Sequence, residues 1–405
     1  MTDPRRQAEG KTPWGMVILL GALTAFAPMS TDMYLSSLPA IGLDLHATPA
    51  QTQGTLAAFF AGMAVGQFVY GPASDRYGRR PPILAGVSIY ILASIVCALA
   101  SSPEMLIGAR FVQAFGGCAG GVVARAMVRD RFDHTETARM LSLMTLIMGL
   151  APILAPMLGA ALLVAGGWRL NFWFMTAFGL VVGAAALWRV RESRSAETLA
   201  QAQSESPFGA YLALIRQPRL VGYAVAGALN GATLFTYISS APGLLMGTYG
   251  VSVAQFPFIF GLNAVGIIAS SQINRYLLRR WTPDEVLGRA SLASVAAAAL
   301  LAVAAVSGFG GPWTVLPLLF VLLSVYGFMQ GNAMAGALSV DIRRAGSVSA
   351  LMGGASFGVG ALASGLTGVL HDGTPRPMVL TMLVALTGSA LALRLLALPK
   401  RGDEA

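Results

Sequence analysis

The sequence Gly71-Pro-Ala-Ser-Asp75-Arg-Tyr-Gly78-Arg79-Arg80-Pro-Pro82 places a cluster of charges between two long uncharged runs. Residues 56–70 precede it and residues 83–102 follow it, and neither run contains a charged side chain. A helix needs about 20 apolar residues to cross the hydrocarbon core of a bilayer, and both runs reach that length once the helix ends are included. The charged stretch therefore predicts a tight loop between two membrane spans. Its arginines place that loop on the cytoplasmic face, and the alternative is a basic turn that only orients the two spans.

The composition of the 405 residues is that of an integral membrane protein. Hydrophobic residues make up 55% and charged residues 11%, with a mean hydropathy of +0.67, whereas a soluble domain carries roughly 25% charged residues. The net charge of +9 would suggest a nucleic-acid ligand in a soluble chain. Basic loops on one side of a bilayer explain it here, so we expect no nucleic-acid partner. Cys97 and Cys118 lie within apolar runs and are typical of small buried side chains.

Twelve apolar runs are long enough to predict membrane-spanning helices, which makes the chain an all-α membrane protein. The runs cover residues 14–42, 50–70, 82–101, 104–129, 137–165, 168–188, 219–246, 252–274, 285–308, 312–340, 346–370 and 377–398. Alternate loops hold most of the arginines, while the other loops hold almost none: Arg376 lies in one of them and Arg169 borders another. Because basic residues concentrate in cytoplasmic loops, this asymmetry predicts that both termini are cytoplasmic.

The longest polar segment, residues 189–218, lies near the middle of the chain. It predicts a cytoplasmic linker between an N-terminal six-helix half, residues 1–188, and a C-terminal six-helix half, residues 219–405.

A weak internal repeat supports this division. Tyr34-Leu-Ser-Ser-Leu-Pro39 recurs as Tyr237-Ile-Ser-Ser-Ala-Pro242, and Asp75-Arg-Tyr77 recurs as Asn274-Arg-Tyr276. Two parallel repeats around a central cavity are one architecture of membrane transporters.

Asp32 is the acidic residue that lies deepest within a predicted span. A charged Asp at a helix centre costs roughly 2.5–3.5 kcal/mol on insertion scales. It should therefore face a water-filled cavity, pair with a cation, or take up a proton because desolvation disfavours its charge. These properties suit a proton-coupling site, and an Asp hydrogen-bonded between helices is the alternative.

Arg110 of the fourth span lies at a comparable depth and is the expected partner of Asp32; snorkelling to the outer headgroups is its alternative. Gln113 shares the helix face of Arg110.

Two further groups of residues predict moving parts. Asp130 ends the fourth span, where we expect it to meet Arg79 or Arg80 and lock the cytoplasmic helix ends together; a solvated surface cluster is the alternative. In the fifth span, Pro152, Pro156 and Gly159 predict a hinge, because prolines four residues apart kink a helix and small residues permit close packing.

Polar and aromatic residues within the spans are candidates for the wall of a substrate cavity, although packing between helices would also explain each of them. They are Tyr34, Gln113, Asn230, Phe235, Tyr237, Asn263, Gln330 and Asn332. The three histidines, His46, His134 and His371, lie in or near loops and predict no metal site. The sequence also contains no phosphate-binding loop or catalytic triad, so we expect neither a cofactor nor an ATP-driven pump, with the proton as coupling ion.

Several stretches resemble one branch of the major facilitator superfamily, the bicyclomycin-resistance/chloramphenicol-efflux group of drug:proton antiporters. They are Ser30-Thr-Asp32-Met-Tyr34-Leu, Gly66-Gln-Phe-Val-Tyr-Gly71-Pro-Ala-Ser-Asp75-Arg-Tyr-Gly78-Arg-Arg-Pro81, Arg110-Phe-Val-Gln113-Ala-Phe-Gly, Ala124-Arg125-Ala-Met-Val-Arg129-Asp130, Ala151-Pro-Ile-Leu-Ala-Pro156 and Gly167-Trp168-Arg169-Leu-Asn-Phe172. The resemblance implies export of bicyclomycin-, phenicol- or sulfonamide-like molecules across the bacterial inner membrane in exchange for protons, by alternating access.

The resemblance also implies roles for individual residues. Asp32 would be a protonation site and Arg110 the fourth-helix arginine of the family. The gating cluster would comprise Gly71, Asp75, Arg79 and Asp130, and the fifth-helix antiporter motif would include Pro156 and Gly159.

Two departures from the family pattern stand out. Ser36 follows Tyr34-Leu35 where this branch has proline, so we expect one kink to be missing. Ala155 and Ala160 flank Pro156 and Gly159, which weakens the antiporter assignment.

Other functions are compatible with twelve spans. A proton-coupled transporter of a small endogenous metabolite, for export or uptake, is the nearest alternative, because a fold does not fix substrate or direction. A membrane-embedded enzyme or receptor is a further one. A lipid-modifying enzyme would carry clustered intramembrane acids or histidines, so the lone carboxylate argues against it. We therefore expect a transporter, not an enzyme, that works as a monomer in the lipid bilayer.

Overall fold

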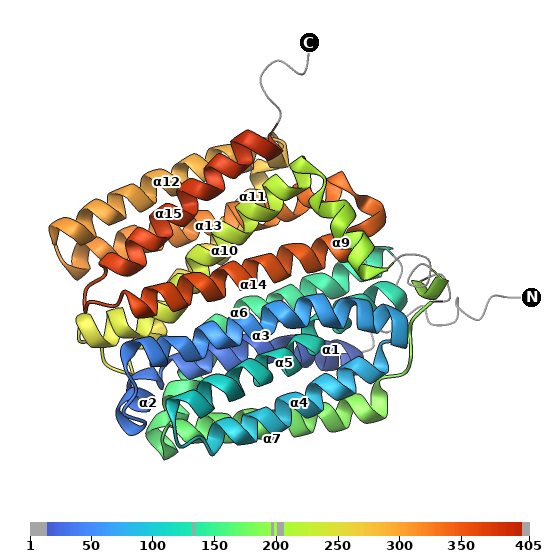
Figure 1. The fold of residues 1–405 in the computed structure, drawn as a ribbon, viewed down its shortest axis with the longest axis horizontal. Helices are drawn as coiled ribbons and strands as arrows, with labels where there is room; N and C mark the ends of the chain where they lie inside the picture. The colour runs from blue at the N-terminus through green and yellow to red at the C-terminus, as the bar shows by residue number, and fades with distance from the viewer. Residues whose placement is uncertain (1–13, 132–133, 196–197, 201–205, 399–405) are drawn as a thin grey trace, which may run out of the picture.

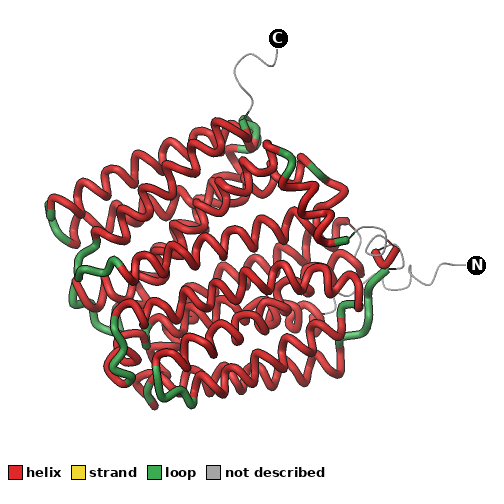
Figure 2. The backbone as a smooth tube through the Cα atoms, in the orientation of Figure 1, coloured by secondary structure: helices red, strands yellow, loops and turns green. Residues whose placement is uncertain are grey.

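The computed structural model describes residues 14–131, 134–195, 198–200 and 206–398. Within these residues the regular structure is helical, as Figure 2 shows. The long helices are α1 Trp14–Leu35, α3 Pro49–Tyr77, α4 Arg80–Ala98, α5 Pro103–Arg131, α6 His134–Gly166, α7 Trp168–Arg189, α10 Pro218–Pro242, α11 Phe256–Leu277, α12 Pro283–Ser307, α13 Pro312–Val340, α14 Ala345–Val369 and α15 Arg376–Ala392. Two short ones are α2 Leu38–Asp44 and α9 Pro207–Ile215. In the part of the chain that the structure describes, 12 helices are long and apolar enough to cross a membrane, which confirms the predicted spans.

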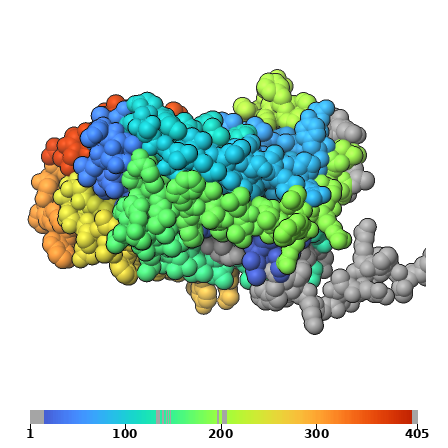
Figure 3. All heavy atoms as spheres, turned by 90° about the horizontal axis from the view of Figure 1, so that it is seen from below, coloured from blue at the N-terminus to red at the C-terminus, as the bar shows by residue number. Residues whose placement is uncertain are grey.

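The long helices form two groups of six. Figure 1 shows α1 and α3–α7 in one group and α10–α15 in the other. Seen from the side of the first group, its blue, cyan and green atoms cover most of the molecule's face (Figure 3). Helix α3 packs along α14, and α6 packs along α11, so these two pairs join the halves. The fold is therefore that of two six-helix halves around a central cavity.

The turn between α3 and α4 is shorter than the predicted loop over residues 71–82. Helix α3 continues to Tyr77 and α4 begins at Arg80, which leaves only Gly78 and Arg79 between them. Gly78 has a φ of 95°, a conformation that glycine adopts without steric strain. The loop prediction was wrong in extent, because polar residues at a membrane surface can continue a helix that begins in the bilayer.

The first predicted span is two helices rather than one. Helix α1 ends at Leu35 and α2 begins at Leu38. The Ser36 hydroxyl donates to the Pro156 carbonyl over 3.2 Å, and Pro39 fits the first turn of α2, where its missing N–H has no helical acceptor. The kink that we expected to be missing is therefore present, since hydrogen bonds and Pro39 replace a proline at position 36.

Candidate functional site

Asp32 lines a cavity of about 190 Å³ between the two halves of the molecule. Helices α1, α6, α10 and α11 contribute its wall, and the carboxylate side chain is itself only 4% exposed. The other wall residues are Met148, Gly149, Pro152, Leu234, Tyr237, Ile238, Phe260, Ala264, Ile267 and Ile268. Among the described residues of this wall, Asp32 is the only charged one and Tyr237 the only other titratable one. The cavity is thus an apolar chamber with a single carboxylate.

Tyr237, on α10, is held in place by two neighbours on α11. The Asn263 amide donates to its hydroxyl over 2.8 Å, and its ring stacks on that of Phe260 with the centroids 5.4 Å apart. Both Tyr237 and Asn263 were candidates for the cavity wall. Tyr237 lines the cavity, whereas Asn263 supports Tyr237.

Arg110 does not pair with Asp32, contrary to our expectation. Among the described residues it donates to Gln113 Oε1 over 2.6 Å, while its Nε and Nη2 atoms have no hydrogen-bond partner. The guanidinium lies over the rings of Tyr34 and Phe59, at 4.4 and 4.3 Å from their centroids. It is completely buried, so it does not snorkel either.

The rotation of α1 explains why the pair does not form. Residues two apart in a helix are rotated by roughly 200° about the helix axis, so their side chains point to nearly opposite sides of the helix. Tyr34 therefore faces Arg110 when Asp32 faces the cavity. Sequence depth placed both charges at a similar level but could not show which way each side chain points.

The remaining cavity candidates bond or pack elsewhere. The Tyr34 hydroxyl donates to Thr55 over 2.8 Å, and the Gln113 amide donates to Ser94 over 2.8 Å. Three further contacts join helices: Asn230 to Gln330 at 3.5 Å, Asn332 to Asn274 at 2.9 Å, and the ring of Phe235 to that of Phe60 at 4.5 Å between centroids. Of the eight candidates, only Tyr237 is part of the wall around Asp32.

The predicted hinge residues of α6 contact either this chamber or the end of α1. Pro152 lines the cavity, and the carbonyl of Pro156 accepts the Ser36 hydroxyl. A Cβ at Gly159 would overlap the carbonyl oxygen of Met33, the residue that follows Asp32. The glycine therefore permits direct contact between the backbones of α1 and α6.

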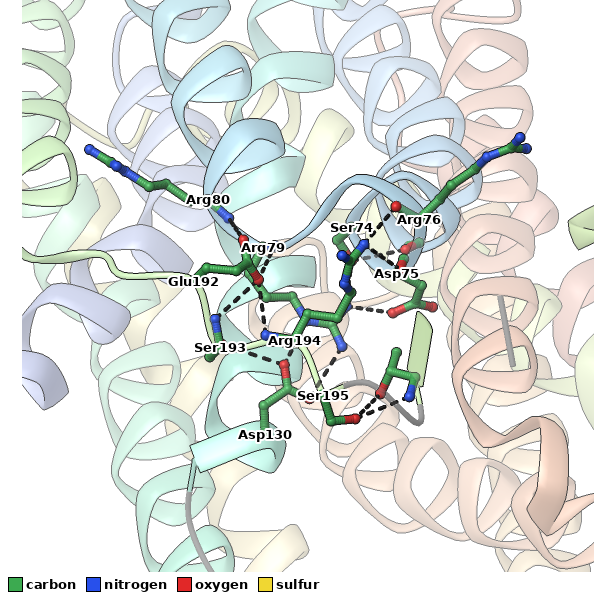
Figure 4. Close-up of polar contacts among 12 residues, drawn as sticks. Ser74, Asp75, Arg76, Arg79, Arg80, Asp130, Glu192, Ser193, Arg194 and Ser195 are labelled. Atoms are coloured by element: carbon green, nitrogen blue, oxygen red, sulfur yellow. Dashed lines mark hydrogen bonds and ion pairs between the residues drawn. The ribbon is translucent and has the colours of Figure 1, made fainter. Parts of the chain in front are cut away.

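A second cluster lies at one end of the bundle, which we call the Arg79 end (Figure 4). Arg79 Nε lies 2.7 Å from Asp130 Oδ2, and its Nη1 pairs with Asp75 and donates to Ser74 over 2.9 Å. Arg80 instead donates to the Leu187 carbonyl over 3.0 Å. Burial by itself would lower the pKa of Arg79, but Asp130 and Asp75 raise it overall, so the arginine stays charged.

Gly71 stands one turn before Asp75 on α3. No atom lies within 4 Å of the position that a Cβ would take there. Gly71 shares a small cleft with Asp75, Arg125 and Arg129, but it does not contact the ion pairs.

Two linker residues that sequence reasoning missed complete the Arg79 cluster. The Glu192 carboxylate accepts the backbone N–H groups of Arg79 and Arg80, over 2.9 and 3.3 Å, at the start of α4. Arg194 donates to the carbonyls of Arg76 and Asp75, over 2.6 and 3.3 Å, at the end of α3. Each charge thus complements the partial charge of the helix end it touches. In the sequence, the only signal for this role is that Glu192 and Arg194 are oppositely charged, two residues apart and directly after a predicted span.

The pKa of Glu192 reflects these contacts. Partial desolvation alone would raise it, but the hydrogen bonds from the backbone amides outweigh that effect and lower the pKa below its ordinary value. Glu192 is therefore an anion at neutral pH.

Among the described residues, no group of three or more His, Cys, Asp or Glu side chains is arranged to hold a metal ion.

Comparison with known proteins agrees with this architecture. The family model of the Major Facilitator Superfamily matches residues 20–365. The chain is 31% identical over 395 residues to a bicyclomycin resistance protein homolog of Haemophilus influenzae, covering 94% of this chain and 96% of that protein. It is also 31% identical over 383 residues to the multidrug resistance protein MdtL of Escherichia coli, covering 94% of this chain and 95% of that protein.

Solved transporter structures share the fold at low sequence identity. A D-xylose-proton symporter superposes with a TM-score of 0.74 at 12% identity, covering 96% of this chain and 99% of that chain. A bacterial homolog of the human lysosomal transporter Spinster, in an inward-facing conformation, superposes with a TM-score of 0.74 at 19% identity, covering 95% and 98%.

Proposed function

The chain belongs to the major facilitator superfamily, and from this premise we propose that it is a proton-coupled exporter of amphipathic small molecules. The observation that carries the proposal is the apolar chamber between the halves, with Asp32 as its only charged wall residue. An apolar cavity with few polar groups suits amphipathic ligands of varied shape. The names of two relatives, which refer to bicyclomycin resistance and multidrug resistance, support the same substrate class.

Asp32 is the proton-coupling residue in this proposal. Burial in the chamber favours the neutral carboxyl group, and water reaching an open chamber favours the carboxylate. A bound substrate and a bound proton would each shift the equilibrium between inward- and outward-open states, so that the two move in opposite directions. Arg110 supports α1 from its other side through Tyr34, without a direct contact to Asp32.

The Arg79 cluster is the gate of the proposed exporter. The arginines of the Arg79 end support a cytoplasmic location for it, because basic residues concentrate on that side of the bilayer. Arg79, Asp75 and Asp130 would hold that end closed and separate when the halves rock, which would open the chamber inward. The proposal also includes a monomer in the bacterial inner membrane with both termini in the cytoplasm.

Drug susceptibility in an efflux-deficient bacterium tests the proposal. Cells would express either this protein or Asp32→Asn at matched membrane levels, against bicyclomycin, a phenicol, a sulfonamide and a cationic dye. We expect resistance to at least one compound that disappears in Asp32→Asn. Resistance that survives in Asp32→Asn would contradict coupling through Asp32, and sensitivity to the whole panel would favour transport of a small endogenous metabolite.

A further inference from the structure

Asn171 connects α7 to α6 and to the break that follows α1, at a buried point. It belongs to α7, and its side chain is completely buried. Its amide nitrogen donates to the hydroxyl of Ser37, in the break between α1 and α2, over 2.7 Å. The same nitrogen donates to the carbonyl of Gly159, on α6, over 3.4 Å.

These bonds hold the helix break where the usual proline is absent. The ring of proline fixes its φ angle, whereas the φ angles of Ser36 and Ser37 are not fixed in this way. Hydrogen bonds of the two serine side chains therefore have to hold the backbone conformation at the break. Ser36 bonds to the Pro156 carbonyl over 3.2 Å and Ser37 accepts from Asn171, so α6 and α7 together hold the break.

The Gly159 carbonyl fixes the orientation of the Asn171 amide. A carbonyl only accepts hydrogen bonds, so the amide nitrogen must face it. The amide oxygen, Oδ1, then points to a place where it has no hydrogen-bond partner among the described residues. An unpaired buried acceptor is unfavourable, so the two bonds that the amide nitrogen donates have to offset this cost.

The same contacts connect α6 to Asp32. Met33, the next residue, lies with its backbone against Gly159, and Ser36 begins the break one turn after Asp32. On α6, Pro152 lies two turns before Gly159 and lines the cavity that Asp32 faces. Bending of α6 at its prolines would therefore move the segment that carries Asp32 only if α1 stays fastened to Gly159 and Pro156.

We propose that Asn171 is a positioning residue that couples the α6 hinge to the Asp32 carboxyl group through Ser37 and Gly159. The inference rests on the proposed role of Asp32 as the proton-coupling residue. Asn171 touches neither proton nor substrate. It keeps the α1 break on α6, so that protonation at Asp32 and bending of α6 occur as one transition.

The test uses the full-length purified protein with Asn171→Leu, Ser37→Ala and their combination. Thr176→Val is the matched control, because Thr176 is a buried polar residue of the same helix whose hydroxyl bonds only to the Phe172 carbonyl, within α7. Asn171→Asp is a second variant in case Asn171→Leu does not fold: it keeps the size of the side chain but cannot donate to Gly159 when ionised.

Two readouts separate positioning from stability. The first is hydrogen–deuterium exchange of the peptide over residues 33–41, which we expect to be about tenfold faster in Asn171→Leu and Ser37→Ala, since both variants lose the hydrogen bond between Asn171 and Ser37. The second is the pH at which transport is half-maximal, measured with a compound of the panel to which the unaltered protein gives resistance. We expect this pH to shift by about one unit in the same direction in both variants. The combination should add little to either change, and Thr176→Val should show neither.

The outcomes distinguish this inference from the proposed function. Faster exchange with an unchanged pH midpoint would show that Asn171 only stabilises the break and would overturn the inference. Additive effects of Asn171→Leu and Ser37→Ala would overturn it as well. If Asp32→Asn keeps the pH profile of the unaltered protein, the proposed function fails instead, while the exchange rates still show whether Asn171 fastens the break.

Discussion

Arg79 and Asp130 form a two-point ion pair, with Nε 2.7 Å from Oδ2 and Nη2 3.2 Å from Oδ1. Asp75 binds the remaining nitrogen of Arg79. Because Arg79 lies in the turn between α3 and α4 while Asp130 lies near the end of α5, this contact fastens three helices at one end of the bundle. Both side chains of the pair are largely buried, at 4% and 10% exposure, which makes the pair costly to break from one side.

Asp130→Asn should weaken the gate. The substitution removes one carboxylate from a buried guanidinium, and breaking such a pair costs about 3 kcal/mol. We expect a lower melting temperature in detergent and a decrease in transport of about tenfold or more. Asp44→Asn is the control, because Asp44 and Arg169 form a half-exposed pair outside this cluster; an equal loss in both variants would contradict a specific role for Asp130.

Glu192→Gln should reveal a pH-dependent contribution to stability. The pKa of Glu192 is lowered from 4.5 in the folded protein, so the carboxylate stabilises the fold above the unfolded pKa and this stabilisation is lost as the pH falls through the folded pKa. We therefore expect the unaltered protein to melt at a higher temperature than Glu192→Gln at pH 7. The difference should shrink as the pH falls below 4.5 and vanish below the folded pKa, as melting curves from pH 7 into the acid range would show. A constant difference would mean that the glutamate charge is not involved.

Gly159→Ala should separate α1 from α6. The new methyl group would overlap the Met33 carbonyl oxygen, and forcing extra volume into a packed site costs about 1–3 kcal/mol. Gly121→Ala on α5 is the matched control, because no atom lies within 4 Å of its added methyl group. We expect Gly159→Ala to lower both the melting temperature and transport, and Gly121→Ala to leave both unchanged. Full transport by Gly159→Ala would show that the helices tolerate separation.

Arg110→Met should reduce transport without lowering the stability of the protein. Arg110 is completely buried and has no carboxylate partner among the described residues, and burying an isolated charge is costly, so an apolar side chain of similar length should not lower stability. We expect this variant to melt no lower than the unaltered protein but to lose transport by about tenfold or more. Arg110→Lys, which keeps a positive charge, is the comparison. Retained transport in Arg110→Met would remove Arg110 from the coupling machinery.

The parts of the structure that could be predicted from sequence are those set by helix length and by charges at helix ends. The twelve spans follow from the length of the apolar runs, and the turn at Gly78 follows from the charges that cannot enter the bilayer. The contact of Arg79 with Asp130 was foreseeable because both residues end spans on the same side.

The parts that could not be predicted depend on the rotation of helices and on contacts with irregular segments. Asp32 and Arg110 lie at similar depths, but the rotation of α1 turns them apart. The break after Leu35 depends on a hydrogen bond that Ser36 donates to the Pro156 carbonyl and on one that Ser37 accepts from Asn171, and both partners lie far away in the sequence. Glu192 acts on the backbone N–H groups of Arg79 and Arg80, and backbone partners leave no trace in a side-chain pattern.

Proton release on substrate binding is the most direct test of proton-coupled export through Asp32. Purified protein in weakly buffered detergent would receive bicyclomycin, and a pH indicator would record released protons while equilibrium dialysis records binding. The proposed mechanism predicts that the unaltered protein releases protons in proportion to bound bicyclomycin and that Asp32→Asn releases none. Equal proton release from Asp32→Asn, or binding to the unaltered protein without any release, would contradict it.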